Sequence, residues 1–362
     1  MTALFSPFQI KGVTLRNRIG APPMCQYAAE DGFVSNWHVP HYAMLARGGA
    51  GLVVVEATAV SSEGRITPGD LGLWRDEQME GLASIAQVIK EGGAVPGIQL
   101  AHAGRKAGCA RPWDGGAPLD ASDPQAWQPI APSSVPYMPG SSHVPREMSL
   151  QDIEQTQRDF VDAARRAAMA GFQWLELHFA HGFLGQSFLS RSSNVRTDRY
   201  GGSLVNRARF LVETVAAVRA VWPEPLPLSV RIGTTEFGEQ ETEAFEETVF
   251  ALRLMKDAGL DLVDLSLSLS TPGEPVPWSP NLLVPYAEIV RNEVGLPVTT
   301  SWLITDAKAA DNFVREGKAD LLLFGRTLLA NPHWPRLAAK ALDKERPDWV
   351  LPASYAHWLQ NW

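Results

Sequence analysis

Residues 174–203 read WLELHFAHGFLGQSFLSRSSNVRTDRYGGS, and they begin with an alternating run, Trp174 to His181, that predicts a β-strand. Seven other short, largely apolar runs recur along the chain, at residues 18–24, 51–58, 95–102, 226–233, 260–269, 296–302 and 319–326. Segments with helical periodicity lie among them, at residues 78–91, 150–170, 204–221, 243–257, 285–294 and 305–315. This alternation predicts a parallel sheet whose strands are joined by helices.

Eight parallel strands with right-handed crossovers close into a barrel. An open doubly wound sheet is the alternative, and a G-x-G-x-x-G turn after the first strand would favour it. Here the first strand runs into PPMCQY (residues 22–27) instead. We therefore predict an α/β fold of the (β/α)8 TIM barrel type, a single domain spanning residues 1–362. One long connection, at about 103–148, is rich in Pro, Gly, Ser and Trp and is expected to be a capping insertion between strands three and four.

Charge and cysteine content restrict the partners and the compartment. A net charge of −8 and a pI near 5.5 argue against nucleic acid or an anionic membrane as a partner. The two cysteines, Cys25 and Cys109, are expected to be free thiols in a reducing compartment. The first residues lack the pattern of a signal peptide, and no apolar run has the length of a membrane span. These features predict a cytoplasmic protein.

Barrel active sites lie at the carboxyl ends of the strands. The side chains expected there are polar, aromatic and basic: Pro23, Met24, Cys25, Tyr27, Ala57, Gln99, His102, His178, His181, Arg231, Trp302, Gly325 and Arg326. The nearest acids are Glu56, Glu176 and Asp264, and they do not form the carboxylate pair of a glycosidase. Two histidines without further ligands nearby make a weak metal site, so no metal is predicted. Paired imidazoles at a strand end can instead hold a substrate oxyanion.

Three of these residues have alternative interpretations. Gly325 permits a close backbone approach and Arg326 suits a phosphate, although Arg326 could equally pair with a surface carboxylate. Arg231 is placed to meet negative charge on a cofactor ring, and a buried ion pair is its alternative. Gln99 could be a satisfied core amide.

Eight motifs fall in order along the chain: PPMCQY (22–27), EAT (56–58), QLAHAGR (99–105), HFAHGF (178–183), SNVRTDRYGGS (193–203), NRARF (206–210), FGR (324–326) and NPHW (331–334). Together they resemble the Old Yellow Enzyme family of FMN-dependent ene-reductases. Cys25 and the C-terminal run from Tyr355 to Leu359 are similar to the bacterial branch of xenobiotic reductases and NADPH dehydrogenases.

The resemblance implies an NAD(P)H-dependent flavin oxidoreductase that reduces small electrophiles such as α,β-unsaturated carbonyls, quinones and nitro compounds, with NADPH or NADH as hydride donor. Cys25 would tune the flavin potential, and His178 and His181 would bind the substrate carbonyl, beside Tyr27. The residues implied to hold FMN are Pro22, Pro23, Met24, Cys25, Ala57, Gln99, Arg231, Trp302, Gly325 and Arg326.

The resemblance also implies a contribution from a second subunit. Trp302, and Trp358 from a neighbouring subunit, would form the wall of the substrate pocket, although both could equally serve in core or interface packing. Residues 345–362 would then lie at an interface of a homodimer or a higher homo-oligomer.

Phe183 departs from the family pattern, which places Tyr there as the acid that protonates the substrate α-carbon. A phenyl ring cannot donate a proton, and general acid catalysis is worth about 10²- to 10⁴-fold. Water or Tyr27 could supply the proton. Alternatively, the natural reaction needs no α-protonation, as in an isomerase, a desaturase or a quinone reductase, or the chain is a Tyr-to-Phe variant of an ene-reductase.

Local patterns predict how two helices begin. Ser149 and Asp152 form the spacing of a capping box. Gly201 to Ser203 predict a turn and an N-cap for the helix that starts at residue 204. Arg196, Asp198 and Arg207 are expected to brace the preceding loop.

Overall fold

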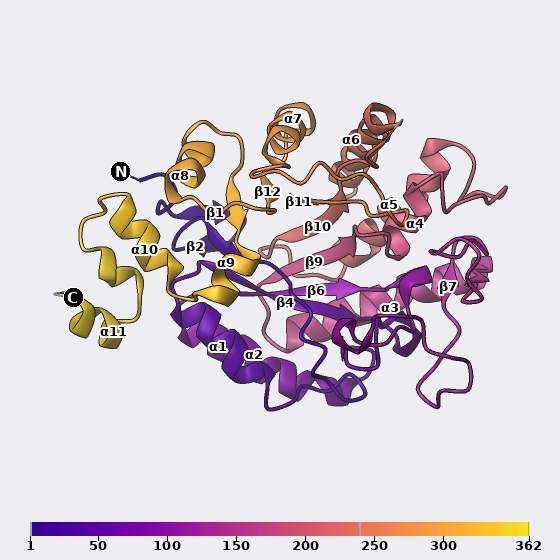
Figure 1. Cartoon of the computed structure of the whole chain (residues 1–362), viewed down its shortest axis with the longest axis horizontal. Helices are drawn as coiled ribbons and strands as arrows, with labels where there is room; N and C mark the ends of the chain where they lie inside the picture. The colour runs from indigo at the N-terminus through magenta and orange to yellow at the C-terminus, as the bar shows by residue number, and fades with distance from the viewer. Residues whose placement is uncertain (1, 239, 361) are drawn as a thin grey trace.

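The computed structural model describes residues 2–238, 240–360 and 362. Eight parallel strands form a closed barrel, because the first strand pairs with both the last and the second. In barrel order they are β3 (Ile19–Ala21), β4 (Leu52–Ala59), β6 (Val95–Ala101), β9 (Trp174–Phe179), β10 (Leu228–Gly233), β11 (Leu262–Ser266), β12 (Val298–Thr300) and β13 (Leu321–Leu323). The predicted (β/α)8 TIM barrel is confirmed (Figure 1).

Six helices match the predicted segments: α2 (Met79–Glu91), α3 (Leu150–Met169), α5 (Leu204–Arg219), α6 (Glu241–Asp257), α7 (Val284–Val294) and α8 (Ala307–Arg315). Both predicted helix starts are confirmed. The Ser149 hydroxyl accepts from the Asp152 N–H while the Asp152 carboxylate accepts from the Ser149 N–H, and the Ser203 hydroxyl accepts from the Asn206 N–H.

The periodicity did not reveal five further α-helices: α1 (His38–Arg47), α4 (Leu184–Leu189), α9 (Gly325–Ala330), α10 (Trp334–Ala341) and α11 (Ala353–Leu359). All five are ten residues or shorter, which leaves few turns over which an apolar period can repeat. Short 3-10 turns complete the helical part: η1 (Ser62–Gly64), η2 (Asp76–Gln78), η3 (Gly104–Lys106), η4 (Pro112–Asp114) and η5 (Pro347–Val350).

An N-terminal hairpin closes one end of the barrel. Its strands β1 (Phe8–Ile10) and β2 (Val13–Leu15) pair antiparallel. Their buried side chains, Phe8, Ile10 and Leu15 among them, pack in one apolar cluster with the first inward residues of the barrel strands, such as Leu52 and Trp174. Because this apolar plug fills the amino end of the strands, only the carboxyl end of the barrel is left for a polar site.

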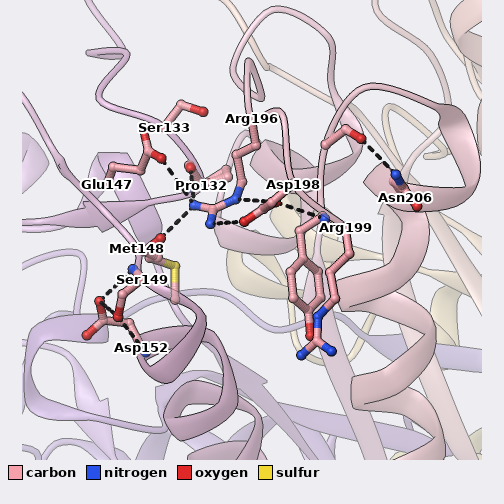
Figure 2. A network of polar contacts seen from close by, with 12 residues as sticks. Pro132, Ser133, Glu147, Met148, Ser149, Asp152, Arg196, Asp198, Arg199 and Asn206 are labelled. Atoms are coloured by element: carbon pink, nitrogen blue, oxygen red, sulfur yellow. Dashed lines mark hydrogen bonds and ion pairs between the residues drawn. The ribbon is translucent and has the colours of Figure 1, made fainter.

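The insertion at 103–148 contains two short paired strands, β7 (Ile130–Ala131) and β8 (Arg146–Glu147). A further short strand, β5 (Leu71–Gly72), extends the sheet beside β4. The Arg196 guanidinium joins the insertion to the loop after α4 (Figure 2), because it donates to the Pro132 and Met148 carbonyls at 2.8 and 2.6 Å and pairs with Asp198 at 2.5 Å. Arg207 donates to the Leu189 and Gly202 carbonyls. The predicted bracing role of these residues is confirmed.

The C-terminal helices α10 and α11 lie at the opposite end of the long axis from β7 (Figure 1). No helix within the described part of the chain combines the length and apolarity needed to cross a membrane.

Candidate active site

Two cavities open at the carboxyl end of the barrel. The first, of about 270 Å³, is lined by Pro22, Pro23, Met24, His181, Arg231, Ser301, Trp302, Leu303, Ile304, Thr305, Leu323, Gly325, Arg326 and Thr327. The second, of about 390 Å³, is lined by residues of the capping insertion together with Tyr27, Ile66, Thr67 and Phe183. His181 lines the first cavity and Phe183 the second, and the His178 ring lies 4.9 Å from His181 and 4.7 Å from Phe183, between ring centres. The predicted histidine pair therefore lies where the two cavities meet.

A backbone hydrogen bond assigns the tautomer of His178, and a serine hydroxyl orients His181. The Ala180 N–H donates to Nδ1 of His178 at 3.2 Å, so the His178 proton is on Nε2. Nε2 of His181 lies 2.7 Å from the Ser266 hydroxyl, which accepts from the Trp302 indole N–H at 3.0 Å. An indole only donates, so the Ser266 hydroxyl accepts from Trp302, and it still has its own proton and a second lone pair for the bond with His181. Nε2–H of His178 is free for an acceptor, and Ser266 fixes the orientation of the neighbouring His181 ring.

Burial keeps both imidazoles neutral. It lowers the pKa of His178 well below its usual value, with a further contribution from the Arg231 charge. The pKa of His181 is lowered in the same way, by burial first and then by His178 and Arg231. Neutral N–H donors can stabilise negative charge that develops on a bound oxygen without themselves being titrated near pH 7.

The backbone turn after His178 depends on a glycine. His181 and Gly182 both have left-handed backbone conformations, with φ of +59° and +68°. A Cβ on Gly182 would lie 2.5 Å from the Leu269 carbonyl oxygen and 3.1 Å from Nζ of Lys106. The glycine therefore allows the turn that aims His181 back toward His178.

Arg231 forms the buried ion pair that was the alternative interpretation, and it also lines the first cavity. Its Nε lies 3.2 Å from a carboxylate oxygen of Asp264, which is the buried ion pair, and its NH2 group lies 3.3 Å from the Ser301 hydroxyl. The guanidinium therefore presents positive charge to the first cavity while it is anchored from within the barrel.

Cys25 and Tyr27 follow the first barrel strand, and both keep their protons at neutral pH. Burial raises the pKa of the Cys25 thiol well above its usual value, and Asp70 and Glu56 add to the shift. Burial also raises the pKa of Tyr27, with a smaller contribution from the neighbouring Cys25. Tyr27 lines the second cavity, facing the same space as Phe183.

The remaining predicted residues occupy different environments. Ala57 and Gln99 lie buried within β4 and β6, and Gln99 donates to Glu176 at 2.8 Å, so it is a satisfied core amide. Trp358 lies on α11, is 81% exposed and lines neither of the two cavities. Within residues 2–238, 240–360 and 362, no group of three or more His, Cys, Asp or Glu side chains is arranged to hold a metal ion.

Three residues of the site are not predicted from the sequence: Ser266, Lys106 and Tyr137. Ser266 ends β11, but the run 260–269 was predicted as one strand because its alternation continues beyond the last paired residue. Lys106 and Tyr137 line the second cavity, and Nζ of Lys106 lies 4.0 Å from the Tyr137 ring centre and 5.9 Å from that of Phe183. Lys106 directly follows the motif QLAHAGR, and this position beside a site motif is the sequence signal that could have identified it.

The first cavity suits FMN. Its wall combines the Arg231 and Arg326 guanidinium groups with apolar surface from Pro22, Met24 and Trp302, as an anionic group with a flat aromatic ring requires. A Cβ on Gly325 would be only in ordinary contact, at 3.4 Å, with Met24 and Pro22, so packing within the protein does not demand the glycine. Because Gly325 has no side chain, its backbone leaves room for a ligand on the side that faces the cavity.

A closed (β/α)8 barrel with a cationic cavity and a histidine pair at the carboxyl ends of its strands defines a flavin-dependent oxidoreductase. Comparison with known proteins narrows this class. A model of the NADH:flavin oxidoreductase / NADH oxidase family matches residues 3–345, and the chain belongs to this family. It is an enzyme that uses FMN with NAD(P)H.

Named relatives agree with this assignment. An NADPH dehydrogenase of Geobacillus sp. (strain WCH70) is 45% identical over 343 residues, which cover 94% of this chain and 95% of the relative. The Old Yellow Enzyme homologue from Zymomonas mobilis superposes with a TM-score of 0.76 at 28% identity, covering 93% of this chain and 92% of that one. Morphinone reductase in complex with tetrahydroNAD gives 0.77 at 27% identity, with coverages of 93% and 90%. The resemblance inferred from the motifs is confirmed.

Proposed function

We propose that the enzyme reduces activated C=C bonds of α,β-unsaturated carbonyl compounds and related electrophiles, such as quinones and nitro compounds, with NADPH or NADH. The observation that carries this proposal is the pair of adjacent, buried and neutral imidazoles, whose ring centres lie 4.9 Å apart and of which His178 has its Nε2–H free to donate to a substrate oxygen. Negative charge develops on that oxygen when hydride reaches the β-carbon, and fixed donors stabilise it.

In this proposal the two cavities have separate tasks. The first holds the cofactor through Pro22, Pro23, Met24, Trp302, Gly325 and Arg326, with Arg231 offsetting negative charge on the ring. Bound there, FMN would supply the hydride-transfer chemistry that links NAD(P)H to the substrate. Cys25 tunes the potential as a neutral thiol, and Ala57 and Gln99 support the strands beneath. The second cavity takes the substrate, between Tyr27 and Phe183.

Anaerobic half-reactions test the histidine roles. NADPH should bleach the bound flavin, and an enone should restore its absorbance. His178→Ala and His181→Ala each remove a donor and should slow the enone step by about 10²- to 10³-fold, the typical loss for one oxyanion donor. His143→Ala is the matched control, because His143 also lines the second cavity but is bonded to the Ala107 carbonyl. A loss below threefold in both site variants would contradict the proposal.

Phe183 favours a second candidate, a flavin-dependent isomerase or desaturase, because these reactions do not need the phenol that Phe183 lacks. Its test is redox-neutral turnover. Loss of a β,γ-unsaturated ketone with gain of its conjugated isomer, at unchanged NADPH, would support it. If the same preparation consumes one NADPH for each enone reduced at a higher rate than it isomerises, the reductase is the correct assignment.

We further propose that the chain works as a cytoplasmic homodimer or higher homo-oligomer, in which Trp358 reaches the partner's site. The support is that Trp358 and Trp362 are 81% and 88% exposed on the C-terminal segment, an unusual position for indole rings. Trp358→Ala should shift the sedimentation profile toward the monomer and weaken enone binding together. A monomeric wild-type enzyme with full activity would contradict this assembly.

A further inference from the structure

A layer of buried polar groups lies inside the barrel, one step below the histidine pair. Glu176 precedes His178 by two residues on β9, and Asp264 precedes Ser266 by two residues on β11, so each points to the same face as the site residue above it. Glu176 is 2% exposed and Asp264 is fully buried. Neither carboxyl group has a role in the function proposed above.

These carboxyl groups share a single cation. Asp264 lies 3.2 Å from Nε of Arg231, and the Glu176 and Asp264 carboxyl groups lie within reach of a hydrogen bond if one of them is protonated. Gln99 donates to the other side of Glu176 at 2.8 Å. When both carboxyl groups are taken as ionised, neither oxygen of Asp264 has a hydrogen-bond partner. Nε of Arg231 also lacks a well-directed hydrogen bond. A proton between the two carboxyl groups would satisfy one of these oxygens.

The groups that face the pair from the surrounding strands do not supply another positive charge. β6 contributes the neutral amide of Gln99, β10 contributes Arg231, and β12 contributes the hydroxyl of Thr299, which lies in register with Asp264. On β9 itself, His178 is held neutral. Two ionised carboxylates with one guanidinium would leave a net negative charge in a dry interior, which is costly.

We propose that Glu176 and Asp264 share one proton, so that together they carry a single negative charge that offsets Arg231 and sets the reduction potential of the bound flavin. They are positioning residues that act through Arg231, because the guanidinium alone reaches the cavity. The inference rests on FMN occupying the first cavity, and on no assumption about the substrate.

Electrostatics agree with this geometry. Burial, together with the neighbouring Asp264 charge, raises the pKa of Glu176 to about 8. Burial also raises the pKa of Asp264, to about 6, while Arg231 opposes that shift. Glu176 is therefore the group that retains the proton at pH 7, and the charge of the triad with Arg231 is zero.

Two variants distinguish the charge states of the carboxyl pair at pH 7. The measured quantity is the equilibrium constant for two-electron reduction of the flavin, determined against a reference dye. Glu176→Gln imitates the protonated acid and should change that equilibrium constant by less than threefold. Glu176→Gln combined with Asp264→Asn leaves Arg231 uncompensated and should favour the reduced flavin by at least tenfold, which is about 30 mV for a two-electron couple. Asp311→Asn is the matched control, because Asp311 is a buried carboxylate paired with Arg315 outside the barrel.

A pH series gives a second test that needs only the single variant. As the pH rises from 7 to 9.5, wild-type Glu176 should ionise and disfavour reduction, so the ratio of wild-type to Glu176→Gln equilibrium constants should fall on the order of tenfold. In the oxidised holoenzyme, the infrared absorption of protonated carboxyl groups should be weaker in Glu176→Gln than in wild type, and the remainder should come from groups such as Glu56, whose pKa burial raises to about 8.

Three results would overturn the proposal: a pH-independent ratio, a change above tenfold in Glu176→Gln at pH 7, or a double variant with wild-type potential. If the double variant does not fold, the pH ratio and the infrared difference still decide. The dissociation constant of FMN, measured separately, distinguishes failure of this inference from failure of the cofactor site.

Discussion

Phe183→Tyr returns a phenol to the position where the chain lacks one. The Phe183 ring lies 4.7 Å from the His178 ring and faces a cavity of about 390 Å³, so a para hydroxyl group would enter open space and not a packed core. We therefore expect a normal fold and a gain in proton transfer. General acid catalysis is worth about 10²- to 10⁴-fold, or about 3 to 5 kcal/mol of activation free energy.

The assay is an anaerobic single turnover that separates two steps. The oxidation of reduced flavin by 2-cyclohexenone should accelerate by at least 10²-fold in Phe183→Tyr, because the α-carbon then has a donor. Reduction of the flavin by NADPH should change by less than threefold, and so should its oxidation by a quinone, which needs no α-protonation. The quinone reaction therefore serves as an internal control.

Tyr27→Phe in both backgrounds tests the other proton source. Tyr27 keeps its proton because burial raises the pKa of its hydroxyl. If Tyr27 substitutes for the missing phenol, its removal should abolish enone reduction in the Phe183 enzyme and matter little in Phe183→Tyr. An enone rate that is unchanged by Phe183→Tyr would refute the view that the absent phenol limits the reaction.

Three further predictions concern the site and its support. Ser266→Ala should raise the KM for an enone by about five- to tenfold, since it removes a hydrogen bond worth about 1 kcal/mol that orients His181, whereas Ser268→Ala should not. Gly182→Ala should lower the free energy of unfolding in urea by at least about 2 kcal/mol, because of its left-handed φ and the close Leu269 carbonyl; a change below 0.5 kcal/mol would contradict this. Burial lowers the pKa of His41 to about 4, so the unfolded chain binds a proton there below pH 6.5 that the folded chain does not. The contribution of His41 to the free energy of unfolding is therefore present above pH 6.5 and is lost toward pH 4, by about 1.4 kcal/mol per pH unit. His41→Gln should reduce the slope of the free energy of unfolding against pH in this range by that amount.

Local patterns predicted the barrel well and its short helices poorly. The signal for each barrel strand is a run of apolar side chains within the strand itself. For this reason β9 and β10 could be recognised from their own residues alone. The helix α1 could not, because only ten residues carry its period. The Arg196 network could be anticipated in part, since Arg196 and Asp198 are close in sequence, but not its bonds to the distant insertion.

The sequence by itself determined the fold, the family and the identity of the strand-end residues, because alternation and motif order are properties of neighbouring residues. It also determined that a phenyl ring stands at position 183. Only the tertiary structure decided the protonation of the site. His181 is oriented by Ser266, to which Trp302 donates, and the charge of Arg231 is offset by a carboxyl pair on two other strands. Protons follow burial and partners that are remote in sequence, and folding alone brings those together.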